Sequence, residues 1–177
     1  MDLFKYTAHE LHEKLVNKEI TAVELTNAVY DRIAAVDEQV NAYISLSKEE
    51  ALAKAAEVDA KIAAGEAIAP LAGIPVVFKD NINIYGQVTS CASKMLQGVE
   101  TVFDAHVTEE LRKEDAVFLG KANMAEFSIG NTTDNSFNVA VHNPWNLNCT
   151  TGGCATAAAV AAGEAIWALA SDTSGDL

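Results

Sequence analysis

The chain has 177 residues, half of them hydrophobic, and its 25 acidic residues against 12 basic ones give a formal net charge of −13. This length fits one domain or a piece of a larger one, and the hydrophobic share is too high for a disordered chain. Because a strongly acidic surface repels phosphate backbones, we expect no direct contact between this chain and nucleic acid.

The cysteines and the first residues bear on metal binding and on location. Cys91, Cys149 and Cys154 lack the spacing of a zinc site, and their odd number argues against a secreted disulfide scaffold. The N-terminus contains no apolar signal core, and no apolar run approaches the length of a membrane span. We therefore expect a cytoplasmic chain with no bound metal and no membrane segment.

Residues 1–66 are predicted to be helical. Capping-box sequences at 7–10, 21–24 and 47–50 each place a hydroxyl residue three positions before a glutamate. In such a box the hydroxyl accepts a hydrogen bond from a first-turn N–H, and the glutamate reaches back to the cap. The third of these helices is rich in alanine and is expected to end at Gly65.

Residues 67–177 are predicted to begin an α/β core, so that the chain 1–177 forms part of a single domain. Apolar runs at 74–78 and 116–119 indicate buried strands, the second ended by Gly120. The other expected elements are a helix capped by Asp104, a short helix over 123–127, a helix over 155–162 with Gly163 as its C-cap, and an apolar run over 166–170. Helices that alternate with buried strands indicate the α/β class.

Lys79 is the first candidate for chemistry, because it follows a buried strand at the edge where α/β folds place their sites. A partly buried lysine holds its proton less tightly and can act as a base. The alternative is a structural lysine whose ammonium reaches solvent or pairs with Asp80. Position alone favours this alternative, because structural lysines outnumber catalytic ones.

Two loops of small residues are further candidates. The paired glycines within 151–154 allow a backbone to approach a ligand closely. The loop 171–175 follows the last apolar run and can present N–H groups to an anion. An ordinary polar turn is the alternative for both loops. The four histidines are scattered, so no Ser–His–Asp arrangement is predicted.

Five segments, in the same order, resemble motifs of the amidase-signature family along essentially the whole chain. They are the segments 71–81 (LAGIPVVFKDN), 120–127 (GKANMAEF), 143–145 (NPW), 158–163 (AAVAAG) and 171–173 (SDT). The resemblance implies the family's α/β fold, a mixed sheet flanked by helices. This chain would form the N-terminal portion of that fold, with its helices first.

Within the family, the segments 89–96 (TSCASKML) and 129–136 (IGNTTDNS) are most similar to the A subunits of tRNA-dependent amidotransferases. That similarity implies a glutaminase whose ammonia serves the conversion of Glu-tRNA(Gln) to Gln-tRNA(Gln). It also implies glutamine as the substrate and the B and C subunits as partners. No cofactor is implied for this chain, because the B subunit is the one that uses ATP and Mg²⁺.

The family's mechanism joins a serine nucleophile, a second serine that relays the proton from a non-proline cis peptide, and a neutral lysine base. The resemblance assigns the base to Lys79. The relay position holds Cys154, in a loop two residues shorter than the family's, and the nucleophile position holds Asp176. The remaining residues implied to bind substrate or oxyanion are Thr173, Ser174, Gly175 and Gly130.

Asp176 is no simple replacement for the serine. Its acyl adduct would be an anhydride, its charge would repel an oxyanion, and pairing with Lys79 would remove the base. We therefore expect the chain by itself not to hydrolyse glutamine. A stand-alone amidase for small amides and a non-catalytic remnant that binds a partner are the alternatives. Chains of the family continue for several hundred further residues, which would supply most of the substrate pocket.

Overall fold

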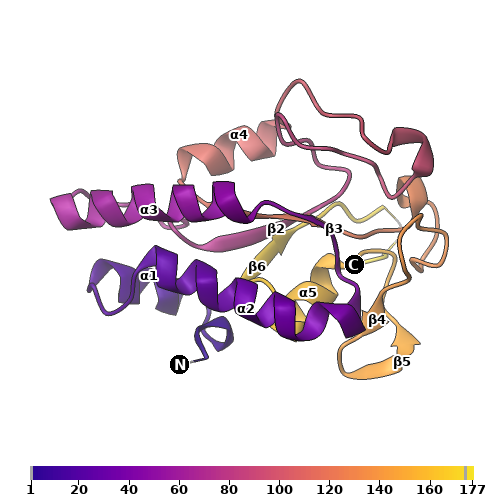
Figure 1. The fold of residues 1–177 in the computed structure, drawn as a ribbon, viewed down its shortest axis with the longest axis horizontal. Helices are drawn as coiled ribbons and strands as arrows, with labels where there is room; N and C mark the ends of the chain where they lie inside the picture. Colours follow the sequence, from indigo (N-terminus) through magenta and orange to yellow (C-terminus); the bar gives the residue numbers. More distant parts are fainter. Residues whose placement is uncertain (1, 174) are drawn as a thin grey trace.

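The computed structural model describes residues 2–173 and 175–177 and has helices first, followed by a mixed α/β unit (Figure 1). The helices are α1 (Ala8–Val16), α2 (Ala22–Val40), α3 (Lys48–Ala64), α4 (His106–Lys113) and α5 (Thr156–Ala162). The strands are β1 (Tyr43–Leu46), β2 (Pro75–Lys79), β3 (Val117–Ala122), β4 (His142–Asn143), β5 (Asn146–Thr150) and β6 (Trp167–Leu169). Three short 3-10 turns are η1 (Leu3–Lys5), η2 (Lys94–Leu96) and η3 (Glu126–Ser128).

The first two α-helices begin at their predicted capping boxes. In the second box the Glu24 N–H donates to the Thr21 hydroxyl at 3.0 Å, and the Thr21 N–H donates to the Glu24 carboxylate at 2.9 Å. Ser47 stands at the N-cap of α3, but its side chain makes no capping hydrogen bond, so this part of the prediction is wrong. Its N–H instead donates to the Leu119 carbonyl at 2.9 Å, which ties the cap to the sheet. Gly65 ends α3 with a φ of +78°, as predicted.

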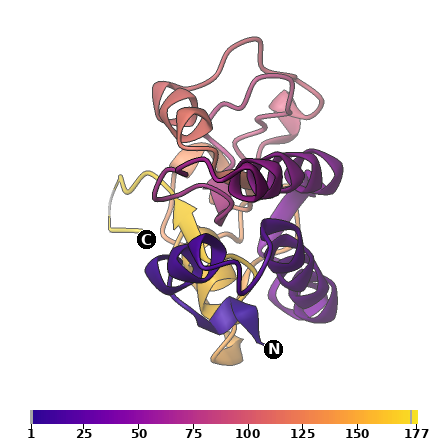
Figure 2. The ribbon, with the colours of Figure 1, turned by 90° about the vertical axis from the view of Figure 1, so that its left-hand side faces the viewer.

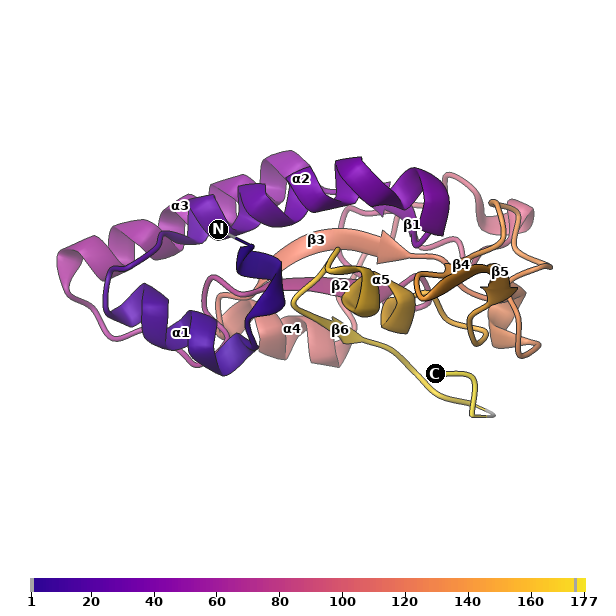
Figure 3. The ribbon, with the colours of Figure 1, turned by 90° about the horizontal axis from the view of Figure 1, so that it is seen from below.

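Four strands form a mixed sheet in the order β1-β3-β2-β6. The strands β3, β2 and β6 are parallel, and β1 pairs antiparallel with β3 at one edge. Figure 3 shows β3, β2 and β6 side by side, with the C-terminal segment leaving β6. Because parallel strands end at the same edge of a sheet, the segments after Lys79, Ala122 and Leu169 start close together.

The strand β3 continues through Gly120 to Ala122, so the prediction that Gly120 ends it is wrong. The register with β2 shifts at this glycine, from Val76 opposite Phe118 to Val77 opposite Gly120. Gly120 has a φ of +148°, and a Cβ there would lie 2.1 Å from the Ser45 carbonyl oxygen. A glycine is therefore needed where β1 crosses this bulge.

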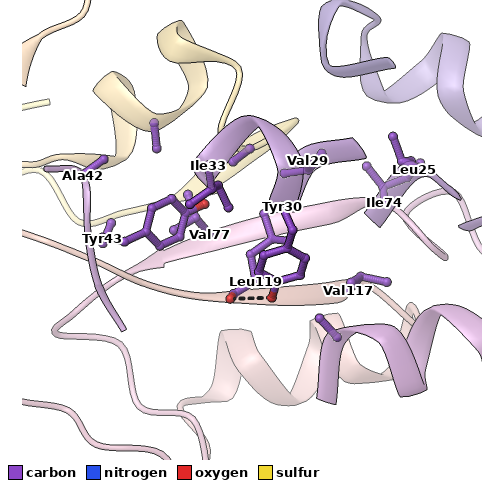
Figure 4. Close-up of a cluster of buried hydrophobic side chains, with 14 of the residues drawn as sticks. Leu25, Val29, Tyr30, Ile33, Ala42, Tyr43, Ile74, Val77, Val117 and Leu119 are labelled. Atoms are coloured by element: carbon purple, nitrogen blue, oxygen red, sulfur yellow. Dashed lines mark hydrogen bonds between the residues drawn. The ribbon is translucent and has the colours of Figure 1, made fainter. Parts of the chain in front are cut away.

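The main hydrophobic core lies between one face of the sheet and the helices α1, α2, α3 and α5. Figure 4 shows the α2 side chains of Leu25, Val29 and Ile33 over the strands β2 and β3, in one cluster with the sheet residues Val77 and Val117. Tyr30 lies in this core with its hydroxyl donating to the Leu119 carbonyl at 2.9 Å. Burying these side chains contributes about 1.5–3 kcal/mol for each large one, which fixes the sheet under the helices.

A smaller core covers the opposite face of the sheet. Phe78 and Phe118 meet there edge to face, with ring centroids 4.7 Å apart, and Leu111 of α4 packs on the same cluster. Figure 2 shows α4 on one side of the sheet and α1 and α5 on the other. The complete burial of β2 follows from being covered on both faces.

Some predicted elements differ from the structure. Asp104 does not cap α4, whose N-cap is Ala105; its carboxylate accepts the Tyr85 N–H at 2.7 Å and pairs with Arg112 at 2.6 Å. The helix expected over 123–127 is only the turn η3 at 126–128. The strand β1 and the β4–β5 hairpin were not predicted. The helix predicted over 155–162 is confirmed as α5, with Gly163 in the left-handed conformation at its end.

Candidate active site

Lys79 ends β2, and its ammonium contacts the segment that follows β6. Its Nζ donates to the Ser171 carbonyl oxygen at 2.7 Å and lies 3.3 Å from Asp176 Oδ2. The side chains of Lys79 and Asp176 are both completely buried. The structure thus pairs Lys79 with Asp176, and not with its sequence neighbour Asp80.

The N–H groups of the last loop are bound by carboxylates of the same loop. The Thr173 N–H donates to Asp176 Oδ1 at 3.1 Å, and the N–H groups of Gly175 and Asp176 donate to Asp172 Oδ1 at 2.6 and 3.0 Å. Ser174 lies outside the described residues. The N–H groups of the predicted oxyanion donors Thr173 and Gly175 therefore bind internal carboxylates, Thr173 that of Asp176 and Gly175 that of Asp172.

The paired glycines of the 151–154 loop pack against Asp176, Gly152 on its backbone and Gly153 on its side chain. A Cβ on Gly152 would lie 2.2 Å from the Asp176 carbonyl oxygen. A Cβ on Gly153 would lie 2.6 Å from the Gly130 carbonyl oxygen and 3.2 Å from Asp176 Oδ2. Only glycine permits backbones to approach so closely. The structure therefore brings together Lys79, Asp176, Gly130 and the 151–154 loop, and it favours close approach over an ordinary turn for that loop.

Cys154, at the predicted relay position, is buried beside these residues. Its Sγ lies 2.9 Å from the Thr156 hydroxyl. Burial raises the pKa of the Cys154 thiol, against the lowering effects of Thr156 and of the Lys79 charge. A protonated, buried thiol is a poor nucleophile. Among the residues that the structure describes no peptide bond is cis, so the cis linkage implied by the resemblance is absent from this loop.

The charge state of Asp176 follows from its contacts. Burial raises the pKa of this carboxyl, but the hydrogen bond from the Thr173 N–H and the Lys79 ammonium lower it, and the net pKa lies below the ordinary 3.8. At neutral pH the residue is therefore a carboxylate. This carboxylate lies against the Lys79 ammonium as its counter-charge, in the place where a neutral nucleophile would stand.

A second buried lysine, Lys121, lies next to the site, and the sequence patterns gave it no role. Lys121 donates to the Thr89 hydroxyl at 3.0 Å and to the Ile82 carbonyl, and its Nζ lies 3.7 Å from Asp80 Oδ1. The Asp80 carboxylate also accepts the Ser90 hydroxyl and the Ser90 N–H. Burial lowers the pKa of Lys121 and raises that of Asp80, each against the charge of the other.

This network supports the loop that carries Gly130. Cys91 and Ala92 follow Ser90 with φ values of +50° and +53°, which are strained for residues other than glycine. The Cys91 carbonyl accepts the Phe127 N–H at 3.0 Å, three residues before Gly130. The Lys121 position was visible in the sequence as part of the segment 120–127, but nothing local signals its partner 41 positions earlier in the chain.

Metal ligation and membrane insertion were both addressed by the sequence patterns. In the described part of the chain, no group of three or more His, Cys, Asp or Glu side chains is arranged to hold a metal ion. None of its helices is both long and apolar enough to cross a membrane. The groups that the described site does bring together are Lys79, Asp176, Cys154 and the surrounding backbone.

Comparisons with known proteins agree with these motifs. The model of the amidase family matches residues 24–176. The A subunit of glutamyl-tRNA(Gln) amidotransferase from Desulforamulus reducens is 50% identical over 179 aligned positions, which cover 100% of this chain and 37% of the relative. Peptide amidase from Stenotrophomonas maltophilia superimposes with a TM-score of 0.81 at 33% identity, over 91% of this chain and 35% of that one. 6-Aminohexanoate cyclic dimer hydrolase gives a TM-score of 0.82 at 30% identity, over 93% and 33% of the two chains.

The lengths in these comparisons carry two further findings. This chain spans little more than a third of the curated relatives it matches. The alignment with the Desulforamulus reducens protein has 179 positions, whereas the chain has 177 residues. Alignment of the whole chain therefore includes at least two gap positions in this chain.

Proposed function

The chain belongs to the amidase family, and we propose that it represents the lysine-bearing N-terminal portion of a glutamine-hydrolysing amidotransferase subunit, inactive by itself. The reaction of the whole subunit would be hydrolysis of the glutamine carboxamide to glutamate and ammonia. The ammonia would then serve amidation of Glu-tRNA(Gln). Shared sequence supports this assignment, since 50% identity to the A subunit of a glutamyl-tRNA(Gln) amidotransferase extends along the entire chain.

The partners and the location follow from the same assignment. The B and C subunits would bind this chain, with ATP and Mg²⁺ used by the B subunit, and the complex would act in the cytoplasm. The formal net charge of −13 supports this division of labour, because an acidic chain is poorly suited to holding tRNA itself. A stand-alone amidase is less well supported, because the solved amidases are 30–33% identical to this chain, against 50% for the amidotransferase relative.

One observation carries the proposed inactivity: the Lys79 ammonium lies 3.3 Å from the Asp176 carboxylate in a fully buried pair. Amide hydrolysis by a serine-type mechanism needs an uncharged base next to a hydroxyl nucleophile. Here the base candidate is paired with Asp176, so a carboxylate stands where the hydroxyl nucleophile would be needed. Cys154 does not replace the nucleophile, because its thiol is buried and its pKa is raised by that burial.

Ammonia release from glutamine tests the proposal directly. The purified chain is assayed alone and with added B and C subunits, and Lys79→Ala serves as the matched control. We expect release no greater than that of the control in both conditions. Release by the unaltered chain that disappears in Lys79→Ala would overturn the inactivity. Lys79-dependent turnover of simple amides without the B and C subunits would favour the stand-alone amidase instead.

Restoring the serine gives a second test of the same idea. Asp176→Ser supplies a hydroxyl at the nucleophile position and frees Lys79. We expect no glutamine turnover, because the relay position still holds Cys154 and the loop around it is shortened. Recovery of turnover in this single variant would show that the shortened loop still supports catalysis.

A further inference from the structure

The Asp176 carboxylate is bound in the way that proteins bind small anions. Its Oδ2 lies 3.3 Å from the Lys79 ammonium, and its Oδ1 accepts the Thr173 N–H at 3.1 Å. Each oxygen thus has its own donor, one charged and one from the backbone. The side chain is completely buried, so water does not compete with these donors.

A glycine packs against the Asp176 carboxylate. Gly153 faces the carboxylate, and a Cβ built there would lie 3.2 Å from Asp176 Oδ2. Gly153 therefore lets the backbone of the 151–154 loop pack directly against the carboxylate. A hollow of about 290 Å³ opens next to it, lined among others by Trp145, Gly152 and Leu177.

We propose that Lys79, the Thr173 N–H and the Gly153 backbone form a binding site for a small carboxylate, which the chain fills with its own Asp176 side chain. Amide hydrolysis turns a carboxamide and water into a carboxylate and ammonia, so a carboxylate is the product class of such a site. The self-bound carboxylate corresponds to a product-bound state that cannot dissociate. This inference rests on the proposed function because it concerns the same residues, but it is tested by binding and not by turnover.

Removal of the internal carboxylate provides the test, with formate as the probe. Asp176→Gly deletes the carboxyl and leaves its donors in place. We expect the thermal midpoint of this variant to fall and then to rise by about 3 °C in formate, relative to chloride at equal ionic strength. The unaltered chain should show no formate-specific shift, because its site is filled. Asp176→Gly combined with Lys79→Met should show none either, because the cationic donor is gone.

Each outcome decides the inference. A formate-specific rise in Asp176→Gly that is lost in the double variant supports it. An equal response in both variants, or none in Asp176→Gly, overturns it. If Asp176→Gly is unfolded in chloride, the same titration is followed by circular dichroism, since a ligand that binds only the folded state shifts an unfolded chain toward it. Asp176→Ala serves as a second variant, with the same expectation. A failed formate response leaves the ammonia assays unaffected, so the two proposals fail separately.

Discussion

Lys79 and Asp176 stand 97 positions apart in the chain and form a fully buried ion pair, with Nζ 3.3 Å from Oδ2. The pair joins the end of β2 to the segment after β6, so the contact depends on the parallel pairing of these two strands. A buried pair of this kind is costly to break from one side, because the remaining charge loses its partner in a place without water. The pair therefore affects both stability and chemistry.

Asp176→Asn should destabilise the chain at neutral pH by about 3 kcal/mol, because the Lys79 ammonium stays buried without its counter-charge. The pKa of Asp176 lies below 3.8 in the folded state. Its stabilising contribution is therefore present above pH 3.8 and is lost as the pH falls through the folded-state value. Denaturant unfolding at neutral pH and at acid pH should show the gap between the two proteins closing on acidification.

The control for this prediction is Lys79→Met with Asp176→Asn, which removes both charges. This double variant should be more stable than Asp176→Asn alone, because no unpaired charge remains buried. A double variant that loses the sum of the two single losses would contradict a direct interaction between the side chains.

Glu164 makes the stability of the chain depend on pH between 4.5 and about 8. Its carboxylate is buried, and neither oxygen has a hydrogen-bond partner among the described residues. Burial raises the pKa of Glu164 to about 8, with Asp37 raising it further and Arg32 lowering it. The folded state thus favours the protonated form, and stability should fall as the pH rises from the ordinary 4.5 toward about 8.

Glu164→Gln should remove this fall. We expect the variant to match the original protein near about pH 5 and to exceed its stability by on the order of 3 kcal/mol above the folded-state pKa. Urea unfolding across this pH range measures the difference. The Tyr43 hydroxyl donates to the backbone carbonyl of Glu164 at 2.7 Å, so that hydrogen bond should persist in the variant. Equal pH profiles for the two proteins would show that Glu164 does not ionise in this range.

The pair of Lys121 and Asp80 should also prove essential for folding. Lys121→Met and Asp80→Asn are each expected to cost about 3 kcal/mol, because each leaves the other charge buried. The double variant should lose less than the sum of the two. The exposed pair of Lys113 and Glu110, 2.6 Å apart, is the matched control, and its removal should leave the unfolding midpoint unchanged. Additive losses at the buried pair would contradict their coupling.

Much of the fold could be predicted from local patterns. The apolar run 74–78 corresponds to the strand β2, and the alanine-rich segment 155–162 corresponds to the helix α5. Both could be predicted because the residues that favour each element are neighbours in the sequence. The strand β1 was missed because it has only four residues and forms by pairing with β3, more than 70 positions later. Gly120 looked like a strand end, whereas its conformation serves a bulge that only the pairing of three strands creates.

The site could be predicted in part by resemblance and hardly at all from local patterns. From its position alone, Lys79 was predicted to have a structural role. The order of the family motifs, by contrast, placed Lys79 in the candidate site. The loop 171–175 was expected to offer free N–H groups, yet the N–H groups of Thr173 and Gly175 donate to the carboxylates of Asp176 and Asp172. No local pattern reveals such a bond, because it depends on how the loop turns back on itself. The network of Lys121 and Asp80 was missed for the same reason.

The capping boxes allow a prediction with an internal control. Thr21→Ala should cost about 1 kcal/mol, because its hydroxyl accepts the Glu24 N–H at 3.0 Å and no other group replaces it. Ser47→Ala should cost far less, since the Ser47 side chain makes no capping hydrogen bond although its sequence is also a capping box. Denaturant unfolding of the two variants measures the difference. Equal losses would mean that the Ser47 hydroxyl caps α3 in solution, and the sequence prediction would then hold for all three boxes.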